Sequence, residues 1–280
     1  MMKHLVLQTD FGLSDGAVSA MYGVANSVNP SIRIFDLTHD ISPYNIWEAS
    51  YRLYQTVPYW PEKTVFVSVV DPGVGTDRWS VAVKTNENQY IVTPNNGTLT
   101  HVKAHIGLKE ARIIDEKINR LPCSGESHTF HGRDVYAYTA ARLASDVISY
   151  EEVGPKVNGD HIVCLTKETA RNNHGIIEGC IDILDVRFGN LWTNIDRSLF
   201  KEAGFRYGDT LQVTIAHHDK DVYKNKMLFA RSFAQTHLGE PLMYVNSLDK
   251  LAVALNQGSF AKAYHIGTGT SWKITIQKVD

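Results

Sequence analysis

The pattern of apolar and polar residues changes character a little past the middle of the chain. In the first half, apolar runs of strand length alternate with stretches whose apolar residues recur at helical spacing. We expect strands at residues 4–9, 32–37, 65–70, 81–84, 90–93 and 113–115. We expect helices after residue 16, over residues 46–57, shortly after residue 97, and from residue 131 onward. Strands that alternate with helices predict an α/β domain with a largely parallel sheet.

Helical periodicity almost disappears after about residue 165. Strand-like runs follow at residues 175–184, 211–216, 223–229, 242–245 and 272–276. A series of strands after an α/β half predicts a second, antiparallel domain, built as a sandwich or a small barrel. We therefore expect two domains, residues 1–165 and residues 166–280.

Composition and charge narrow the class of protein. The 280 residues are 43% hydrophobic and 21% charged, which is ordinary for a globular protein. With 28 basic and 30 acidic side chains and no long basic run, a nucleic-acid partner is not expected. No apolar stretch approaches the length of about 18–20 residues that a membrane span needs, and no signal peptide precedes the first strand. Three widely spaced cysteines, Cys123, Cys164 and Cys180, fit reduced thiols in a cytoplasmic protein.

Acidic side chains follow two of the expected buried strands. Asp10 follows the first strand, and Asp71 opens the loop Asp71-Pro72-Gly73-Val74-Gly75 after the third, with Arg78 seven positions later. Ligands of open α/β sheets bind just beyond the carboxyl ends of the strands, so these side chains are site candidates. The alternative for Asp71 and Arg78 is an ion pair that only stabilises a surface turn.

Two further segments carry candidate chemistry. His131 stands just before the amino end of an expected helix, although a histidine satisfied by the local backbone is an alternative. Residues 185–194 bring together a carboxylate, two aromatic side chains and an amide. Phe188 and Trp192 could both lie in the core, which is favoured for Trp192, but an aromatic with an amide side chain is also what an adenine pocket needs.

Several common motifs are absent from the sequence. There is no Gly-x-Gly-x-x-Gly after the first strand, no phosphate-binding Gly-x-x-x-x-Gly-Lys-Ser/Thr and no Gly-x-Ser-x-Gly. A metal hydrolase that uses His131, Asp10 and Asp71 remains an alternative, but the chain lacks the paired-ligand motifs of zinc hydrolases. We therefore expect neither a metal nor a cofactor.

Six motifs together make the chain resemble a known family. They occur in this order: Thr9-Asp10-Phe11-Gly12, Val70-Asp71-Pro72-Gly73-Val74-Gly75 with Arg78, Pro94-Asn95-Asn96-Gly97, Thr129-Phe130-His131-Gly132-Arg133-Asp134, Phe188-Gly189-Asn190-Leu191-Trp192-Thr193-Asn194, and Asn246-Ser247. Over essentially its whole length the chain resembles the S-adenosyl-L-methionine (SAM) hydroxide adenosyltransferases, the adenosine-forming SAM hydrolases, which are relatives of the fluorinase and chlorinase.

The resemblance implies an α/β amino domain, a β-barrel-like carboxyl domain and a homotrimer with its active site between subunits. The implied reaction cleaves SAM with water to adenosine and L-methionine, and SAM is the substrate rather than a cofactor. The family carries an Asp-Arg-His set around the attacking water, matched here by Asp71, Arg78 and His131. The halogenases have tyrosines where Asp71 and His131 stand, which places this chain with the hydrolases.

The same resemblance implies a set of substrate contacts. Asp10 is expected to hold the ribose hydroxyls, with Tyr44 packed nearby. The remaining contacts are Phe188 and Phe233 around adenine, Asn190 on its edge, and Asp15, Asp185 and Ser247 on the methionine end. Ala17 and Leu248 depart from the fluorinase, which has a serine and an arginine there.

Each residue of the set has an expected part in the chemistry. The sulfonium already makes methionine a good leaving group, so positioning of a water molecule is the main task. An arginine beside Asp71 favours the ionised carboxylate, so we expect Asp71 to orient the water and His131 to accept its proton. A chlorinase-like halide transferase and a non-catalytic protein that binds SAM or adenosine are the alternatives.

Overall fold

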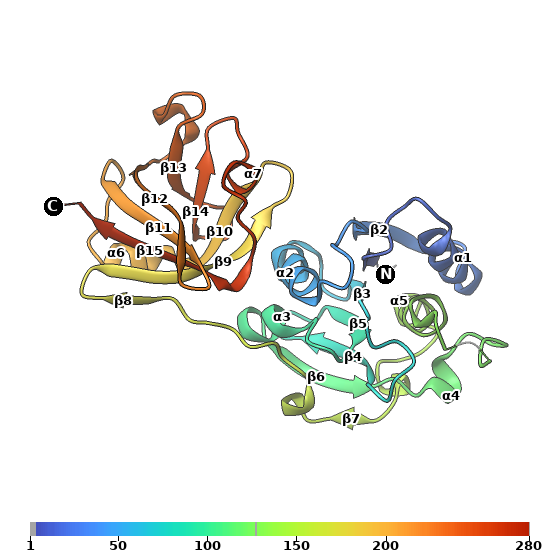
Figure 1. Ribbon diagram of the computed structural model, residues 1–280. Coiled ribbons are helices and arrows are strands. Elements are labelled where there is room, and N and C mark those ends of the chain that lie inside the picture. Colours follow the sequence, from blue (N-terminus) through green and yellow to red (C-terminus); the bar gives the residue numbers. More distant parts are fainter. Residues whose placement is uncertain (1–3, 127, 280) are drawn as a thin grey trace. The chain divides into compact units, whose positions relative to one another are not determined.

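The computed structural model describes residues 4–126 and 128–279. The chain forms two compact units, Met1–Leu165 and Thr166–Asp280 (Figure 1). Among the described residues, none of the helices combines the length and the apolar character that crossing a membrane requires.

A seven-stranded mixed sheet forms the centre of the first unit, in the order β2-β1-β3-β5-β4-β6-β7. Its strands are β1 (His4–Thr9), β2 (Arg33–Thr38), β3 (Val65–Val69), β4 (Ser80–Thr85), β5 (Tyr90–Pro94), β6 (Leu108–Ile113) and β7 (Lys156–Val157). The pairs β1–β2, β1–β3 and β3–β5 are parallel, and the pairs that involve β4, β6 and β7 are antiparallel. The predicted largely parallel sheet is therefore confirmed for its first four strands.

Helices cover both faces of this sheet, as Figure 1 shows. They are α1 (Ala17–Val28), α2 (Ile46–Thr56), α3 (Thr100–His105), α4 (Glu116–Asn119), the π-helix η2 (Gly132–Ala137), α5 (Tyr138–Ala144), and the 3₁₀ turns η1 (Val57–Tyr59), η3 (Glu151–Val153) and η4 (Gly159–His161). Because side chains alternate along a strand, Leu5 and Leu7 pack toward α1 and α5, whereas Val6 packs toward α2 and α3. Both faces of β1 are thus buried, which explains its apolar sequence.

Two local expectations differ from the structure. The strand expected at residues 113–115 is β6, which lies earlier, at Leu108–Ile113. The sequence pattern misplaced it because the charged residues Lys109, Glu110 and Arg112 interrupt the apolar run. The helix expected from residue 131 begins as a π-helix and continues as α5, a distinction that apolar spacing does not resolve.

The second unit is a closed mixed barrel of seven strands. The strands of its sheet are β8 (Arg171–Asn173), β9 (Ile176–Asp185), β10 (Asn190–Asp196), β11 (Thr210–His217), β12 (Lys220–Phe229), β13 (Pro241–Val245), β14 (Lys250–Leu255) and β15 (Gly269–Lys278). The order β10-β14-β13-β12-β11-β15-β9 closes because β10 also pairs with β9, and β8 extends it at β9. The predicted antiparallel, barrel-like domain is confirmed, with one parallel pair, β12–β13.

Three short helices accompany the barrel: α6 (Arg197–Glu202), η5 (Phe233–Gln235) and α7 (Phe260–Tyr264). Phe200 of α6 and Phe260 of α7 are buried in the core beside strand residues such as Leu191 and Val253. Trp192 is buried, as expected, and its indole N–H donates to the hydroxyl of Tyr244.

Candidate active site

The register of the parallel sheet brings two acidic residues to the same edge. Thr9 at the end of β1 pairs with Val69 at the end of β3, so Asp10 and Asp71 both leave the sheet at its carboxyl edge. A polar side chain holds this edge in place, because the Asn96 amide donates to the carbonyl of Val70 at 2.8 Å. The Asn-Asn-Gly motif after β5 therefore fixes the backbone immediately before Asp71.

The loop between Asp71 and Arg78 folds back on itself so that its two ends meet. The Arg78 Nε donates to Asp71 Oδ1 at 2.6 Å, and Arg78 Nη2 donates to Oδ2, which makes a two-pronged ion pair. The Thr76 hydroxyl donates to the carbonyl of Gly73 at 2.7 Å, and Gly75 has φ +80°, a conformation that favours glycine. The side chains of Arg78 and Asp71 are only 11% and 5% exposed, so little water screens the pair.

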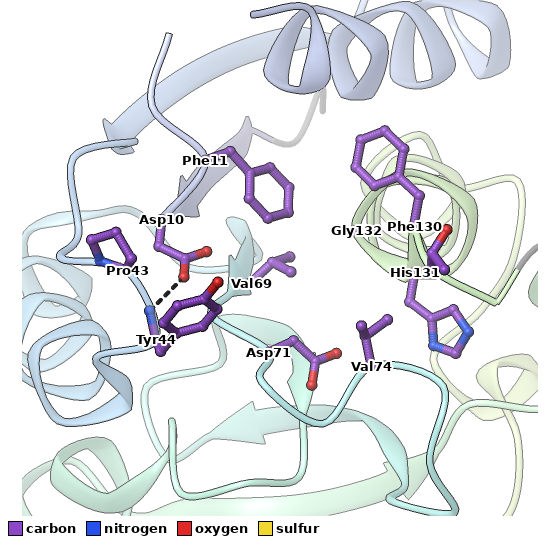
Figure 2. A pocket seen from close by; sticks show the side chains of 11 residues that line it. Asp10, Phe11, Pro43, Tyr44, Val69, Asp71, Val74, Phe130, His131 and Gly132 are labelled. Carbon is purple, nitrogen blue, oxygen red and sulfur yellow. Dashed lines mark hydrogen bonds between the residues drawn. The ribbon is translucent and has the colours of Figure 1, made fainter. Parts of the chain in front are cut away.

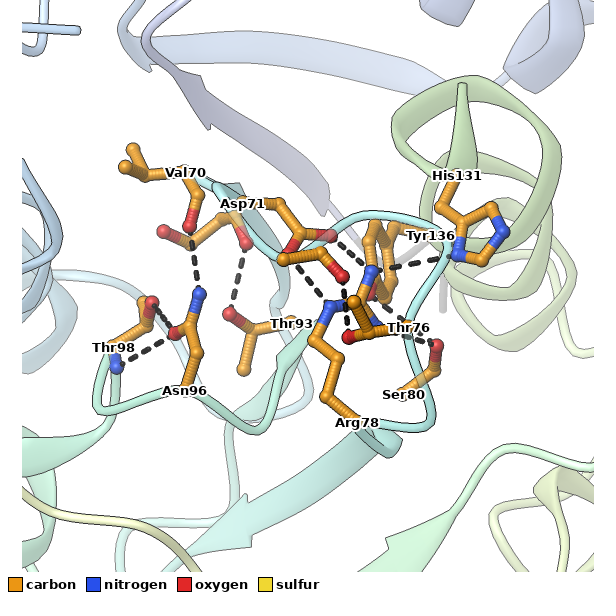
Figure 3. A network of polar contacts seen from close by, with 12 residues as sticks. Val70, Asp71, Thr76, Arg78, Ser80, Thr93, Asn96, Thr98, His131 and Tyr136 are labelled. Carbon is orange, nitrogen blue, oxygen red and sulfur yellow. Dashed lines mark hydrogen bonds and ion pairs between the residues drawn. The ribbon is translucent and has the colours of Figure 1, made fainter. Parts of the chain in front are cut away.

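His131 lies on the other side of the Arg78 guanidinium from Asp71 (Figure 3). Its Nδ1 is 3.4 Å from Arg78 Nη2, and its Nε2 is 3.1 Å from Nη2 of Arg120. Arg120 is held in turn by Glu116, which accepts its hydrogen bond at 2.5 Å. The imidazole thus lies between two guanidinium groups that come from different segments of the chain.

Burial lowers the pKa of His131 below its ordinary value. The nearby charges act in both directions: Glu116 and Asp71 raise this pKa, whereas Arg120 and Arg78 lower it. Burial is the largest cause and the net direction is downward, so the imidazole is neutral at pH 7.

Asp10 and Tyr44 are joined through the backbone. A carboxylate oxygen of Asp10 accepts the backbone N–H of Tyr44 at 2.8 Å, and Tyr44 has φ +66°. The turn that carries Asp10 is held by buried His39, whose ring nitrogen bonds the Thr9 hydroxyl at 2.8 Å and whose carbonyl accepts the N–H of Gly12. The Tyr44 side chain is left 74% exposed.

A cavity of about 350 Å³ gathers these residues in the first unit. It is lined by Asp10, Phe11, Pro43, Tyr44, Val69, Asp71, Val74, Thr129, Phe130, His131 and Gly132. Figure 2 shows Asp10 and Tyr44 on one side and His131 on the other, with Asp71 between them. The cavity thus combines two carboxylates and an imidazole with an apolar wall.

A larger cavity, of about 820 Å³, lies in the second unit. It is lined by Asp185, Arg187, Phe188, Asn190, Phe233, Tyr244, Leu255, Asn256, Gln257, Gly258 and Ser259. Phe188 is 65% exposed, whereas Asn190 is buried and its amide donates to Asp185 at 3.4 Å. Gly189 between them has φ +70°, and a Cβ there would collide with Ser259. Glycine is therefore required at the turn that presents Phe188 and Asn190.

Two of the expected substrate contacts do not line either cavity. Asp15 is exposed, and its carboxylate accepts the N–H of Ala17, the first residue of α1. Ser247 is exposed in the turn after β13. The contacts expected at the methionine end are thus reduced, within these two cavities, to Asp185.

Several lining residues were not among the sequence candidates. Phe11, Phe130 and Gly132 lie inside motifs that the resemblance rests on, so their positions were available from the sequence. Tyr244 and the turn at residues 255–259 carried no signal, because barrel closure alone brings them beside Asp185. Arg120 and Glu116 were also missed, since nothing in their spacing relates them to His131.

The ligand set of a metal hydrolase is not formed in the described part of the chain. Within residues 4–126 and 128–279, no three His, Cys, Asp or Glu side chains group as a metal ion would require. Asp10 instead accepts a backbone N–H, and both oxygens of Asp71 accept from Arg78.

The fold and these two cavities define the class of protein. A carboxylate, a guanidinium and an imidazole in contact at the carboxyl edge of an α/β sheet are typical of an enzyme that acts on a small molecule. The chain belongs to the SAM hydroxide adenosyltransferase family: the N-terminal domain of that family matches residues 5–154, and its C-terminal domain matches residues 179–273.

Individual relatives agree with this assignment. A protein of Methanocaldococcus jannaschii named (R)-S-adenosyl-L-methionine hydrolase is 35% identical over 234 residues, covering 82% of this chain and 80% of its own. A fluorinase of Actinopolyspora mzabensis is 30% identical and covers 97% of this chain and 96% of its own. A crystal structure of an uncharacterized conserved protein from Thermotoga maritima is 32% identical, with a TM-score of 0.89 over 98% of this chain and 100% of that one.

Proposed function

We propose that this protein hydrolyses SAM to adenosine and L-methionine by in-line attack of water on the ribose C5′ carbon. The observation that carries the proposal is the contact of Arg78 with both Asp71 and His131 beside a cavity lined by Asp10. The names of the hydrolase relatives, at 35% identity for the archaeal protein, give independent support. No cofactor is needed, because the sulfonium supplies its own neutral leaving group.

The first cavity would hold the ribose and the attacking water. Asp10 offers a carboxylate to the ribose hydroxyls, and Asp71 and His131 border the space where the water would lie. Arg78 keeps the Asp71 carboxylate in one orientation, so the water would be held in line before the reaction begins. Positioning of this kind can supply up to about 7–11 kcal/mol of a reaction barrier.

The second cavity would hold the adenine and the methionine end. Phe188 and Phe233 offer aromatic faces, Asn190 offers an amide to the base edge, and Asp185 offers a carboxylate to the methionine ammonium. Asp15 and Ser247 remain candidates for the methionine end, although neither lines this cavity.

Labelled water tests the reaction directly. The protein is incubated with SAM in ¹⁸O-water, and adenosine is isolated by chromatography and analysed by mass spectrometry. We expect one ¹⁸O atom in the 5′-hydroxyl. Unlabelled adenosine, or no product while SAM still binds, would contradict the proposal, and the latter would identify a SAM-binding protein without turnover.

Halide transfer is tested in the same assay, because fluorinases are among the relatives. With excess chloride or fluoride present, we expect adenosine and no 5′-halo-adenosine. A halogenated product would move the protein to the transferase class.

We further propose a homotrimer in which the first unit of one chain and the second unit of a neighbour complete each site. The support is that the residues proposed for ribose and for adenine line separate cavities in the two units, and that each cavity carries a highly exposed aromatic residue, Tyr44 or Phe188. Chains carrying Asp71→Asn and chains carrying Phe188→Ala are co-expressed, and the mixed assembly is purified with two tags. Activity at low SAM concentration is expected to return in the mixture; no gain over either variant would exclude sites shared between chains.

The cytoplasmic location stays a prediction. It rests on the sequence and on three free thiols, Cys123, Cys164 and Cys180.

A further inference from the structure

His131 is placed between two hydrogen-bond donors. A guanidinium group has only N–H donors and no acceptor. Arg120 Nη2 lies 3.1 Å from the imidazole Nε2, and Arg78 Nη2 lies 3.4 Å from Nδ1. Both nitrogens of the ring therefore face a donor, although a neutral imidazole can accept at only one of them.

The two distances decide which nitrogen accepts. The contact of 3.1 Å at Nε2 is within the usual range for a hydrogen bond, whereas 3.4 Å at Nδ1 is beyond it. A proton on Nε2 would point at an N–H of Arg120. A proton on Nδ1 leaves the Nε2 lone pair free to accept from Arg120 and breaks no close contact with Arg78.

The Arg120 side chain is held in place by an ion pair with Glu116. Glu116, one helical turn earlier, accepts from Arg120 at 2.5 Å and also accepts from the Ser80 hydroxyl at 3.1 Å. The Arg120 side chain is 13% exposed, and Arg120 is not among the residues that line the cavity. It therefore acts on the site through His131 rather than on a bound molecule.

We propose that Arg120, held by Glu116, is a positioning residue that fixes His131 in the tautomer with its proton on Nδ1. His131 then has no free lone pair for the proton of the water, because Nδ1 carries a proton and Nε2 accepts from Arg120, and Asp71 is the first acceptor of that proton. This assignment rests on the proposed hydrolysis of SAM, and it reverses the expectation that His131 accepts the proton of the water.

The reaction balances with these parts. The water oxygen forms a bond to C5′ while the C5′–S bond breaks. The electron pair of the broken bond stays on sulfur, which leaves as the neutral thioether of methionine. The 5′-oxygen is then a protonated hydroxyl, which is strongly acidic, so the Asp71 carboxylate is basic enough to take its proton. Solvent removes the proton from Asp71 afterwards.

The tautomer can be read without turnover. The full-length protein is labelled with ¹⁵N-histidine, and the His131 signals are identified at pH 7.5 by their loss in His131→Asn. A nitrogen that carries a lone pair resonates far downfield of one that carries a proton. We expect the lone pair on Nε2 and the proton on Nδ1; the opposite arrangement in the wild-type protein would overturn the proposal.

Variants of Arg120 test its role. Arg120→Met removes the donor, so we expect the Nδ1 proton to redistribute and kcat to fall about 10- to 100-fold with KM little changed, as for the outer partners of histidines in metal sites. Arg120→Lys keeps a cationic donor and is expected to restore part of kcat and the tautomer. Arg142→Met is the matched control, because Arg142 bonds the Ile118 carbonyl in the same segment at 2.7 Å and does not contact His131.

The pH profile provides a second readout. The charged groups that face His131 are Glu116, Arg120, Arg78 and Asp71. Loss of the Arg120 cation raises the pKa of His131, so the ¹⁵N signals of His131 are expected to titrate at higher pH in Arg120→Met than in the wild type and to stay in place in Arg142→Met. An unchanged titration and an unchanged tautomer in Arg120→Met would overturn the proposal. The expected tautomer without formation of adenosine would overturn the proposed function and leave the tautomer assignment standing.

Discussion

Replacing Arg78 with lysine keeps the positive charge and removes the two-pronged geometry. Arg78 reaches Asp71 with Nε at 2.6 Å and with Nη2, and its Nη2 also lies 3.4 Å from His131. A lysine ammonium is a point charge that cannot bind both carboxylate oxygens and contact the imidazole in this planar arrangement. The Asp71 carboxylate would then lose one of its two defined contacts.

The expected effects on stability and on rate can be separated. One hydrogen bond to a charged group is worth about 1.5–3 kcal/mol, so the free energy of unfolding is expected to fall by about that amount. A misplacement of about 1 Å at a reacting group can cost about 100-fold in rate, so kcat is expected to fall by roughly that factor. KM is expected to change little, because the proposed adenine contacts lie in the second unit.

Initial rates of adenosine formation, measured by chromatography, and urea denaturation test the Arg78→Lys variant. Arg112→Lys is the matched control, because Arg112 makes a similar close pair with Glu110 through Nε at 2.8 Å and Nη2 at 2.7 Å and lines neither cavity. The control is expected to lose stability and keep kcat. A kcat for Arg78→Lys within about threefold of wild type would refute the reasoning that Arg78 orients Asp71.

Further predictions concern the barrel cavity and pH. Phe188→Ala is expected to raise KM about 5- to 150-fold in steady-state kinetics, because stacking of a base on an aromatic ring is worth about 1–3 kcal/mol. Phe188→Tyr keeps the ring and is expected to keep KM. An unchanged KM in the alanine variant would exclude adenine stacking on Phe188. Gly189→Ala is expected to lower the unfolding free energy by about 1–2 kcal/mol because of the left-handed backbone, and by about 1–3 kcal/mol more because the new Cβ collides with Ser259. Gly175→Ala is the control, because Gly175 has φ +87° and no neighbour within 4 Å of the new Cβ, so it shows the backbone cost alone. Equal losses of unfolding free energy in urea denaturation would contradict the collision. The pKa of His131 is lower in the fold than its unfolded value of about 6.5, so the contribution of His131 to stability is present above about pH 6.5 and is lost as the pH falls through the folded pKa. Urea denaturation at several pH values across this window is expected to show a smaller loss of unfolding free energy for His131→Asn than for the wild type. Equal dependence of the unfolding free energy on pH in the two proteins would refute the lowered pKa.

The sequence was informative where local pattern and burial agree. Strands β1 and β3 are buried on both faces, so their sequences are continuous apolar runs that the pattern identifies directly. Strand β6 pairs with the antiparallel half of the sheet and carries charged side chains, so its start was misplaced. The parallel pairing of β12 with β13 likewise has no local signature, because it depends on which strands meet when the barrel closes.

The candidate site was likewise predictable from the sequence only in part. Asp71 and Arg78 are seven residues apart across a glycine-containing loop, and a loop that short keeps its ends close, so their pairing was foreseeable. His131 is 53 residues from Arg78, and its place beside them was expected only from the resemblance to the family. Asp15 and Ser247 are exposed and line neither cavity, so their parts at the methionine end stay predictions from the resemblance.

The sequence by itself determined the α/β half, the strand-rich half, the family and the residue types of the site. Only the tertiary structure placed Arg120, which donates to Glu116, against His131 and so gave the imidazole a second guanidinium neighbour besides Arg78. The physical reason is that strand and helix periodicity and short-loop chemistry are local properties of the chain. The protonation and orientation of a buried side chain are set instead by partners that packing brings together from distant positions.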